Sequence, residues 1–75
     1  MLDRREIDAL WFTEQPVPGA RFRLNDAVRI GGGPEVGAVG SVISLEALDP
    51  EPTYLIELSS GAAVRVLERA LDAAV

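Results

Sequence analysis

A β-hairpin is predicted by residues 28–42, which read Val-Arg-Ile-Gly-Gly-Gly-Pro-Glu-Val-Gly-Ala-Val-Gly-Ser-Val. Apolar and polar residues alternate at both ends of this segment, and such alternation is typical of a strand with one buried face. The glycines and the proline in the middle favour a tight, exposed turn. The segment therefore predicts two neighbouring strands of a small antiparallel β-domain.

Further strands are expected on both sides of this hairpin. Alternating patterns predict strands at 20–24 or 27–31, at 38–45, at 53–58 and at 62–66, with a short final one within 70–75. Gly40 interrupts the second of these strands, so we expect a bulge or a sharp bend there. Residues 67–69 are expected to form one helical turn. The segment 70–75 fits either a brief closing strand or a frayed helix, because its apolar residues also have helical spacing.

The glycine spacing resembles the KOW element, which occurs in SH3-like barrels of transcription elongation factors and some ribosomal proteins. The positions that match the pattern of that family are Val28, Ile30, Gly33, Gly37, Gly40 and Val42. The later strands are similar to SH3-like barrels in general, including the C-terminal barrel of the nitrile hydratase β subunit. The resemblance implies a mainly β fold, with a small five-stranded SH3-like antiparallel barrel at about 20–75. The length of 75 residues predicts a single domain over residues 1–75, and the residues before the barrel predict a short N-terminal helix at about 3–14.

The N-terminal helix is predicted from its cap and its apolar face. Asp3 is a good N-cap, and Glu6 three residues later completes a capping box. One apolar face is formed by Ile7, Leu10 and Trp11, with Phe12 at its edge. Because so short a helix cannot stand alone in water, this face must dock on something. We favour docking on the chain's own β-domain, with Phe12 more exposed than Trp11. The alternative is that Trp11 and Phe12 contact a second chain.

The composition argues against catalysis. The 75 residues include no histidine and no cysteine, which excludes Ser/His/Asp and Cys/His mechanisms and imidazole or thiolate metal sites. Asp49 and Glu51 form an acidic pair, but Pro50 separates them on a loop that we expect to be exposed, so neither catalysis nor metal binding is expected there. The glycine loop lacks the lysine and the following helix of a phosphate-binding loop. We therefore expect no enzyme activity, no cofactor and no metal.

The charge argues against nucleic acid as the partner. The formal net charge is -5, and every basic residue is an arginine. RNA-binding KOW domains commonly carry a lysine near the second glycine, whereas this loop offers Glu35, Val36, Ala38 and Val39. A basic strip of Arg21, Arg23 and Arg29 remains the one candidate for anion binding, and phosphate binding needs such a cationic face. The N-terminus is charged and no apolar run is long enough to span a membrane, so a cytoplasmic location without membrane contact is expected.

The favoured hypothesis is a non-catalytic protein-binding or adaptor module of SH3-like shape. Its partner would be another protein, a second copy of this chain included. The candidate partner-binding residues are Trp11, Phe12, Arg21, Arg23, Arg29 and Tyr54. Two alternatives remain open, a KOW-type RNA-associated domain of the transcription or translation machinery and an accessory subunit of an enzyme complex.

Overall fold

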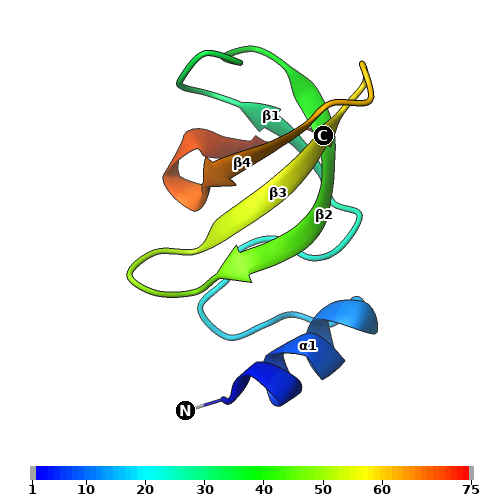
Figure 1. Cartoon of the computed structure of the whole chain (residues 1–75), viewed down its shortest axis with the longest axis vertical. Coiled ribbons are helices and arrows are strands. Elements are labelled where there is room, and N and C mark those ends of the chain that lie inside the picture. The colour runs from blue at the N-terminus through cyan, green and yellow to red at the C-terminus, as the bar shows by residue number, and fades with distance from the viewer. Residues whose placement is uncertain (1, 75) are drawn as a thin grey trace.

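The chain folds into one helix and five strands, as described for residues 2–74 by a computed structural model (Figure 1). The elements in chain order are α1 (Arg4–Phe12), β1 (Ala27–Ile30), β2 (Val39–Ala47), β3 (Thr53–Leu58), β4 (Ala63–Leu67), the 3-10 turn η1 (Glu68–Ala70) and β5 (Leu71–Ala73). The predicted mainly β composition and short N-terminal helix are confirmed.

The five strands form a single antiparallel sheet in the order β4-β3-β2-β1-β5. The expected antiparallel pairing of the second and third strands is confirmed, since Gly40 lies opposite Leu58 and Leu45 opposite Tyr54. The sheet is open. Its edges are β4 and β5, and no ladder joins these two strands within residues 2–74, so the pairing alone does not close the sheet into a barrel.

Strand β2 curves along its length, as Figure 1 shows. Two register shifts against β3 each leave one extra residue on β2, Ile43 and Glu46. Such bulges bend a strand and increase its twist. They also let Val42 and Leu45, three positions apart, both point into the core. Of the bulge or sharp bend expected at Gly40, the bulge is wrong, because Gly40 pairs in regular register with Val28 and Leu58 and the irregularities lie further along the strand.

The strand expected at 20–24 is not formed, and β1 is the second of the two alternatives. The backbone N–H groups of this segment bind side chains rather than a neighbouring strand. Arg21 N–H donates to the Glu68 carboxylate at 2.6 Å, and Arg23 N–H donates to the Asp26 carboxylate at 2.8 Å. We call residues 13–26, which connect α1 to β1, the arm.

The C-terminal segment returns to the first strand. The helical turn expected at 67–69 is present one residue later, as η1. The next residues form β5, in which Leu71 lies opposite Ile30 and is buried. The strand alternative for this segment is thus correct for residues 71–73, and Val75 lies outside the described residues.

The helix docks on the sheet of its own chain, as predicted. Asp3 and Glu6 form the capping box, with the Asp3 carboxylate accepting the Glu6 N–H at 2.9 Å. Trp11 is only 3% exposed, whereas Phe12 is 69% exposed. Arg4 on α1 donates to the backbone carbonyl of Leu45 on β2 at 2.9 Å, which ties the helix to the free side of that strand. The helix ends two residues earlier than expected, and Glu14 beyond it has a left-handed φ of 58°.

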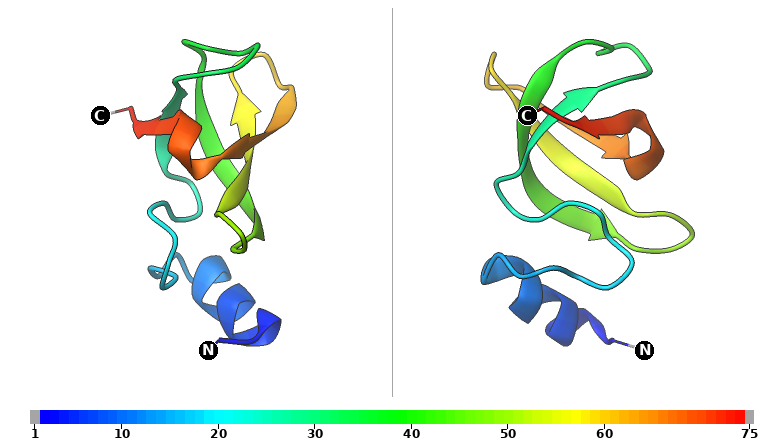
Figure 2. Two further views of the ribbon diagram at one scale, coloured as in Figure 1. Left: turned by 90° about the vertical axis from the view of Figure 1, so that its left-hand side faces the viewer. Right: turned by 180° about the vertical axis from the view of Figure 1, so that it is seen from behind.

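The helix lies at one end of the molecule, away from the loop between β1 and β2 (Figures 1 and 2). The core joins one face of the sheet to α1 and to the arm. Its buried residues are Ile7, Trp11, Val17, Phe22, Val28, Ile30, Val42, Leu45, Tyr54, Ile56, Val66 and Leu71. Burial of this apolar surface is the main source of stability in so small a domain.

The β1–β2 loop is an ordered turn. Gly37 N–H donates to the Ile30 carbonyl at 2.7 Å, and Ile30 N–H donates to the Ala38 carbonyl at 2.8 Å. Gly33 and Gly37 have φ angles of 85° and 91°, in the left-handed region that glycine adopts at little cost. The turn predicted from the glycine cluster is confirmed.

Candidate functional site

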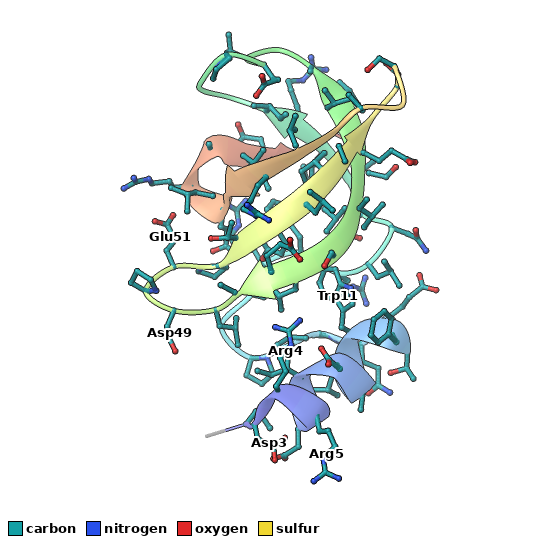
Figure 3. All side chains as sticks on the ribbon, viewed as in Figure 1. Asp3, Arg4, Arg5, Trp11, Asp49 and Glu51 are labelled. Atoms are coloured by element: carbon teal, nitrogen blue, oxygen red, sulfur yellow. The ribbon has the colours of Figure 1, made fainter. Side chains whose placement is uncertain are left out.

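The six residues proposed from the sequence do not form one site. Trp11 and Tyr54 lie in the core, 3% and 0% exposed, where their rings pack against the chain itself. Trp11 lies between α1 and the sheet in Figure 3. This placement accounts for both rings by packing and leaves no surface on them for a partner. Phe12 is exposed at the end of α1, Arg21 and Arg23 are exposed on the arm, and Arg29 is exposed on β1.

Tyr54 is the centre of an aromatic cluster that holds the arm and the helix to the sheet. Its ring lies 6.2 Å from that of Trp11 and meets that of Phe22 edge-on at 5.7 Å, centroid to centroid. The Arg21 guanidinium lies over the Phe22 ring at 4.8 Å, at the edge of the cluster. Such aromatic pairs contribute about 0.5–1.5 kcal/mol each beyond the area they bury.

The polar end of Tyr54 is fully bonded. Its hydroxyl donates to the Glu68 carboxylate at 2.7 Å and accepts the Phe22 N–H at 3.4 Å. Burial raises the pKa of the Tyr54 phenol well above its ordinary value, and the hydrogen bond to Glu68 raises it further. Because Glu68 also accepts the Arg21 N–H, this carboxylate joins η1, β3 and the arm. The tyrosine therefore has a structural role in this state of the protein.

The acidic pair on the β2–β3 loop is split in the structure as well as in the sequence. Asp49 and Glu51 are labelled on this loop in Figure 3. The Glu51 carboxylate forms an ion pair with Arg69 at 3.7 Å and accepts the Arg69 N–H at 3.2 Å. Glu51 thus anchors η1 to the loop, while Asp49 is exposed. The structure places the two carboxylates in different surroundings.

A second carboxylate is held by neighbouring side chains on the sheet. Glu46 accepts a hydrogen bond from the Ser44 hydroxyl at 2.8 Å and another from Arg65 at 3.2 Å. Both bonds lower the pKa of the Glu46 carboxyl below its ordinary value, and the bond from Ser44 has the larger effect. Since Arg65 and Arg69 both have acidic partners, neither arginine of the last two strands and η1 is free for an anion.

Ion pairing leaves four arginines unengaged. Within residues 2–74 the ion pairs are Arg4–Asp8, Arg65–Glu46 and Arg69–Glu51. The arginines without an acidic partner in that range are Arg5, Arg21, Arg23 and Arg29. Three of these form the strip proposed from the sequence. Arg21 and Arg23 lie on an irregular segment rather than on a strand, so the strip does not have the strand spacing that its alternation predicted.

An open groove lies over the ends of three strands and the hairpin turn between β3 and β4. Its volume is about 510 Å³, and its lining residues are Ala27, Val39, Gly40, Ser41, Glu57, Leu58, Ser59 and Gly61. We call this feature the groove. Most of these side chains are small, and Val39 is an exposed apolar residue in it, 41% accessible.

The strand register explains which side chains meet in the groove. Ala27 lies opposite Ser41, and Ser41 lies opposite Glu57. Opposed residues of antiparallel strands project from the same face of the sheet, so these three form a row across β1, β2 and β3. Val39 lies two residues from Ser41 and projects from the same face. It is flanked on β1 by Arg29, which in turn lies opposite Asp72 on β5.

Position 40, between Val39 and Ser41 on β2, requires glycine. A Cβ atom at this position would overlap the Glu57 carbonyl oxygen and would lie 2.9 Å from the Ile56 side chain. The backbones of β2 and β3 therefore approach each other too closely for any side chain here. A side chain at position 40 would project from the core face of the sheet, opposite to Val39 and Ser41, so the packing of β2 on β3 requires this glycine.

The polar side chains of the groove are Ser41, Glu57 and Ser59. Within residues 2–74, no three acidic residues gather in an arrangement that could hold a metal ion. No helix in the described part of the chain is long and apolar enough to cross a membrane. The groove is thus chemically simple, with one carboxylate, two hydroxyls and an apolar patch.

Sequence reasoning missed the groove. Glu57 occupies an outward position of the strand at 53–58, and Val39 begins a strand, so each residue alone is unremarkable. The signal that unites them is the pairing register, which depends on the two bulges in β2. No pattern in a single segment reports that register.

Comparisons with protein-family models, with curated proteins and with solved structures find no match for this chain.

Proposed function

We propose that this chain is a non-catalytic protein-binding module of SH3-like shape and that the groove is its contact surface. The observation that carries the proposal is the groove itself, in which an exposed valine and small side chains surround a single carboxylate. Ligand sites in proteins combine apolar lining with a few polar groups that fix orientation. An open hollow of this kind suits a segment of another protein better than a small molecule, because it cannot enclose its ligand.

The proposed SH3-like shape is supported by the strand order and by the bent β2. This strand pairs with β1 at its start and with β3 along its length, so one curved strand can serve both halves of a barrel. The chain then returns through η1 to set β5 beside β1. The KOW-like spacing falls in the same place, with two core residues on β1 and the glycines of the turn before β2.

The proposal is tested by affinity capture with three forms of the protein. The bait is immobilised wild type, exposed to nuclease-treated extract of the cells that produce it. Val39→Asp places a charge in the groove, and Val36→Asp is the matched control on the β1–β2 loop, where Val36 is 64% exposed outside the groove. Thermal melts must first show that both variants fold.

The expected result is a protein retained by wild type and by Val36→Asp and lost with Val39→Asp. A buried charge against an apolar partner residue is costly, so the loss should be at least tenfold. Equal retention by all three forms would mean that the groove is not the contact surface. Retention of no protein by wild type would count against the binding function itself.

An RNA-associated role of KOW type is the second candidate, and it has one observation in its favour. Arg21, Arg23 and Arg29 are exposed and have no acidic partner within residues 2–74. The net charge of -5 opposes this role, because phosphate binding is mainly charge neutralisation. Sub-micromolar binding of generic RNA at about 150 mM salt, lost in Arg21→Ala and Arg29→Ala, would establish it over the protein-binding proposal, since non-specific binders reach only about 10⁻⁴–10⁻⁶ M there. A role as accessory subunit of an enzyme complex is a special case of protein binding.

A further inference from the structure

Glu57 is the one charged side chain among the residues that line the groove. Its carboxylate has neither an ion pair nor a side-chain hydrogen bond to any residue in the range 2–74. The side chain is exposed on the outer face of β3. A negative charge without a partner thus stands on one wall of a hollow whose other walls are apolar or neutral.

The surrounding charges do not compensate Glu57. The arginines of β4 and η1 are engaged by Glu46 and Glu51. Arg29 lies across the sheet from Glu57, on the far side of β2, and forms no ion pair with it in the described range 2–74. The molecule as a whole carries a net charge of -5, which attracts a cationic partner and repels an anionic one.

The spacing of the two recognition elements is that of an extended chain. Glu57 lies opposite Ser41, and Val39 lies two residues further along β2, so Glu57 and Val39 are diagonal neighbours. Diagonal neighbours across a sheet are about 7–8 Å apart. Residues two apart in an extended peptide project from the same side at about 6.5–7 Å. One extended ligand can therefore place a cation at Glu57 and an aliphatic side chain at Val39.

We infer that the groove binds an extended segment of a basic protein, with an arginine or lysine two residues from an aliphatic residue. The cation pairs with Glu57, and the aliphatic side chain packs on Val39. The small lining residues let the backbone of the segment approach the sheet. This inference rests on the proposed binding function and specifies the chemistry of the partner.

The test is a titration of the isotopically labelled protein, followed by backbone amide NMR shifts at low salt. The probe is a blocked pentapeptide of serines with arginine second and valine fourth. One control peptide has glutamate in place of the arginine, and another has arginine and valine adjacent. Glu57→Gln removes the proposed partner charge, and Glu35→Gln is the matched control, since Glu35 lies on the β1–β2 loop and does not line the groove.

We expect the arginine probe to shift amides of the groove with a dissociation constant of about 0.1–1 mM, and the other two peptides to bind more weakly. Glu57→Gln should weaken binding of the arginine probe about two- to fivefold, the range for an exposed ion pair, while Glu35→Gln should leave the affinity unchanged. Equal shifts from the arginine and glutamate peptides would overturn the inference and leave the binding function standing. The inference would also be overturned if the arginine probe shifts no amide of the groove while the captured partner protein shifts them. Failure of capture, in contrast, removes the function.

Discussion

Replacement of Trp11 by alanine tests whether the N-terminal helix is part of the folded unit. The indole is 3% exposed and packs on Tyr54, with the two ring centroids 6.2 Å apart. Removing a buried aromatic side chain costs about 3–5 kcal/mol. A domain of 75 residues has roughly 4–11 kcal/mol of stability in total, so the loss is a large part of it.

The expected effect on the melting temperature follows from the size of the domain. For a domain of this length, 1 kcal/mol corresponds to about 4–8 °C, so Trp11→Ala should lower Tm by at least about 12 °C. Trp11→Phe should cost clearly less, since it keeps a ring against Tyr54 and the indole N–H that it removes has no hydrogen-bond partner within residues 2–74. Phe12→Ala is the matched control. Because Phe12 is 69% exposed, its loss should change the free energy of unfolding by no more than about 0.5 kcal/mol.

The assay is thermal unfolding by circular dichroism at two protein concentrations. A docked helix in the same chain predicts the same Tm at both concentrations for wild type. If Trp11→Ala melts at the wild-type temperature, the helix does not contribute to the fold and the packing of Trp11 on Tyr54 is refuted. If the Tm of wild type rises with concentration and the Tm of Trp11→Ala does not, the helix is stabilised by a second chain instead.

Three further outcomes follow from the structure. Burial raises the pKa of Tyr54, so its neutral form contributes stability that is complete below the unfolded pKa of about 10 and is lost as pH rises further. Tyrosinate absorbance should therefore appear only together with unfolding. Ordinary titration of Tyr54 in the folded protein would contradict this. The hydrogen bond from Ser44 lowers the pKa of Glu46, so the contribution of this carboxylate to stability is complete above the unfolded pKa of 4.5 and is lost as pH falls. The Tm of Glu46→Gln should therefore depend slightly less on pH in the acid range than that of wild type. An unchanged dependence would be evidence against the bond. Gly40→Ala should destabilise by about 1–3 kcal/mol through overlap with the β3 backbone, whereas Gly32→Ala, with open space around it, should be nearly neutral in the same denaturant titration.

The elements that the sequence predicts well are those with local signals. The capping box of Asp3 and Glu6 begins α1, and the alternation at 53–58 corresponds to β3 residue for residue. In each case, the residues that form the signal lie within a few positions of one another in the chain. They are sufficient because the hydrogen bonds or the buried face that they imply are the ones that the fold uses.

The failures are cases in which distant residues decide. The segment 20–24 alternates like a strand, but its Arg21 N–H is bound by Glu68, 47 residues away, so it becomes part of the arm. The irregularity expected at Gly40 lies further along β2, because the bulges at Ile43 and Glu46 are set by the pairing with β3. The groove was missed for the same reason, since only the resulting register brings its walls together.

The central claim is that the groove is the surface through which this protein binds another. The most direct measurement is a map of amide shifts in the labelled protein when the protein captured by wild type is added. We predict that the affected amides cluster at residues 27, 39–41, 57–59 and 61, which line the groove. Shifts confined to Phe12, Arg21 and Arg23, with the groove unchanged, would contradict the account and assign binding to the helix and the arm.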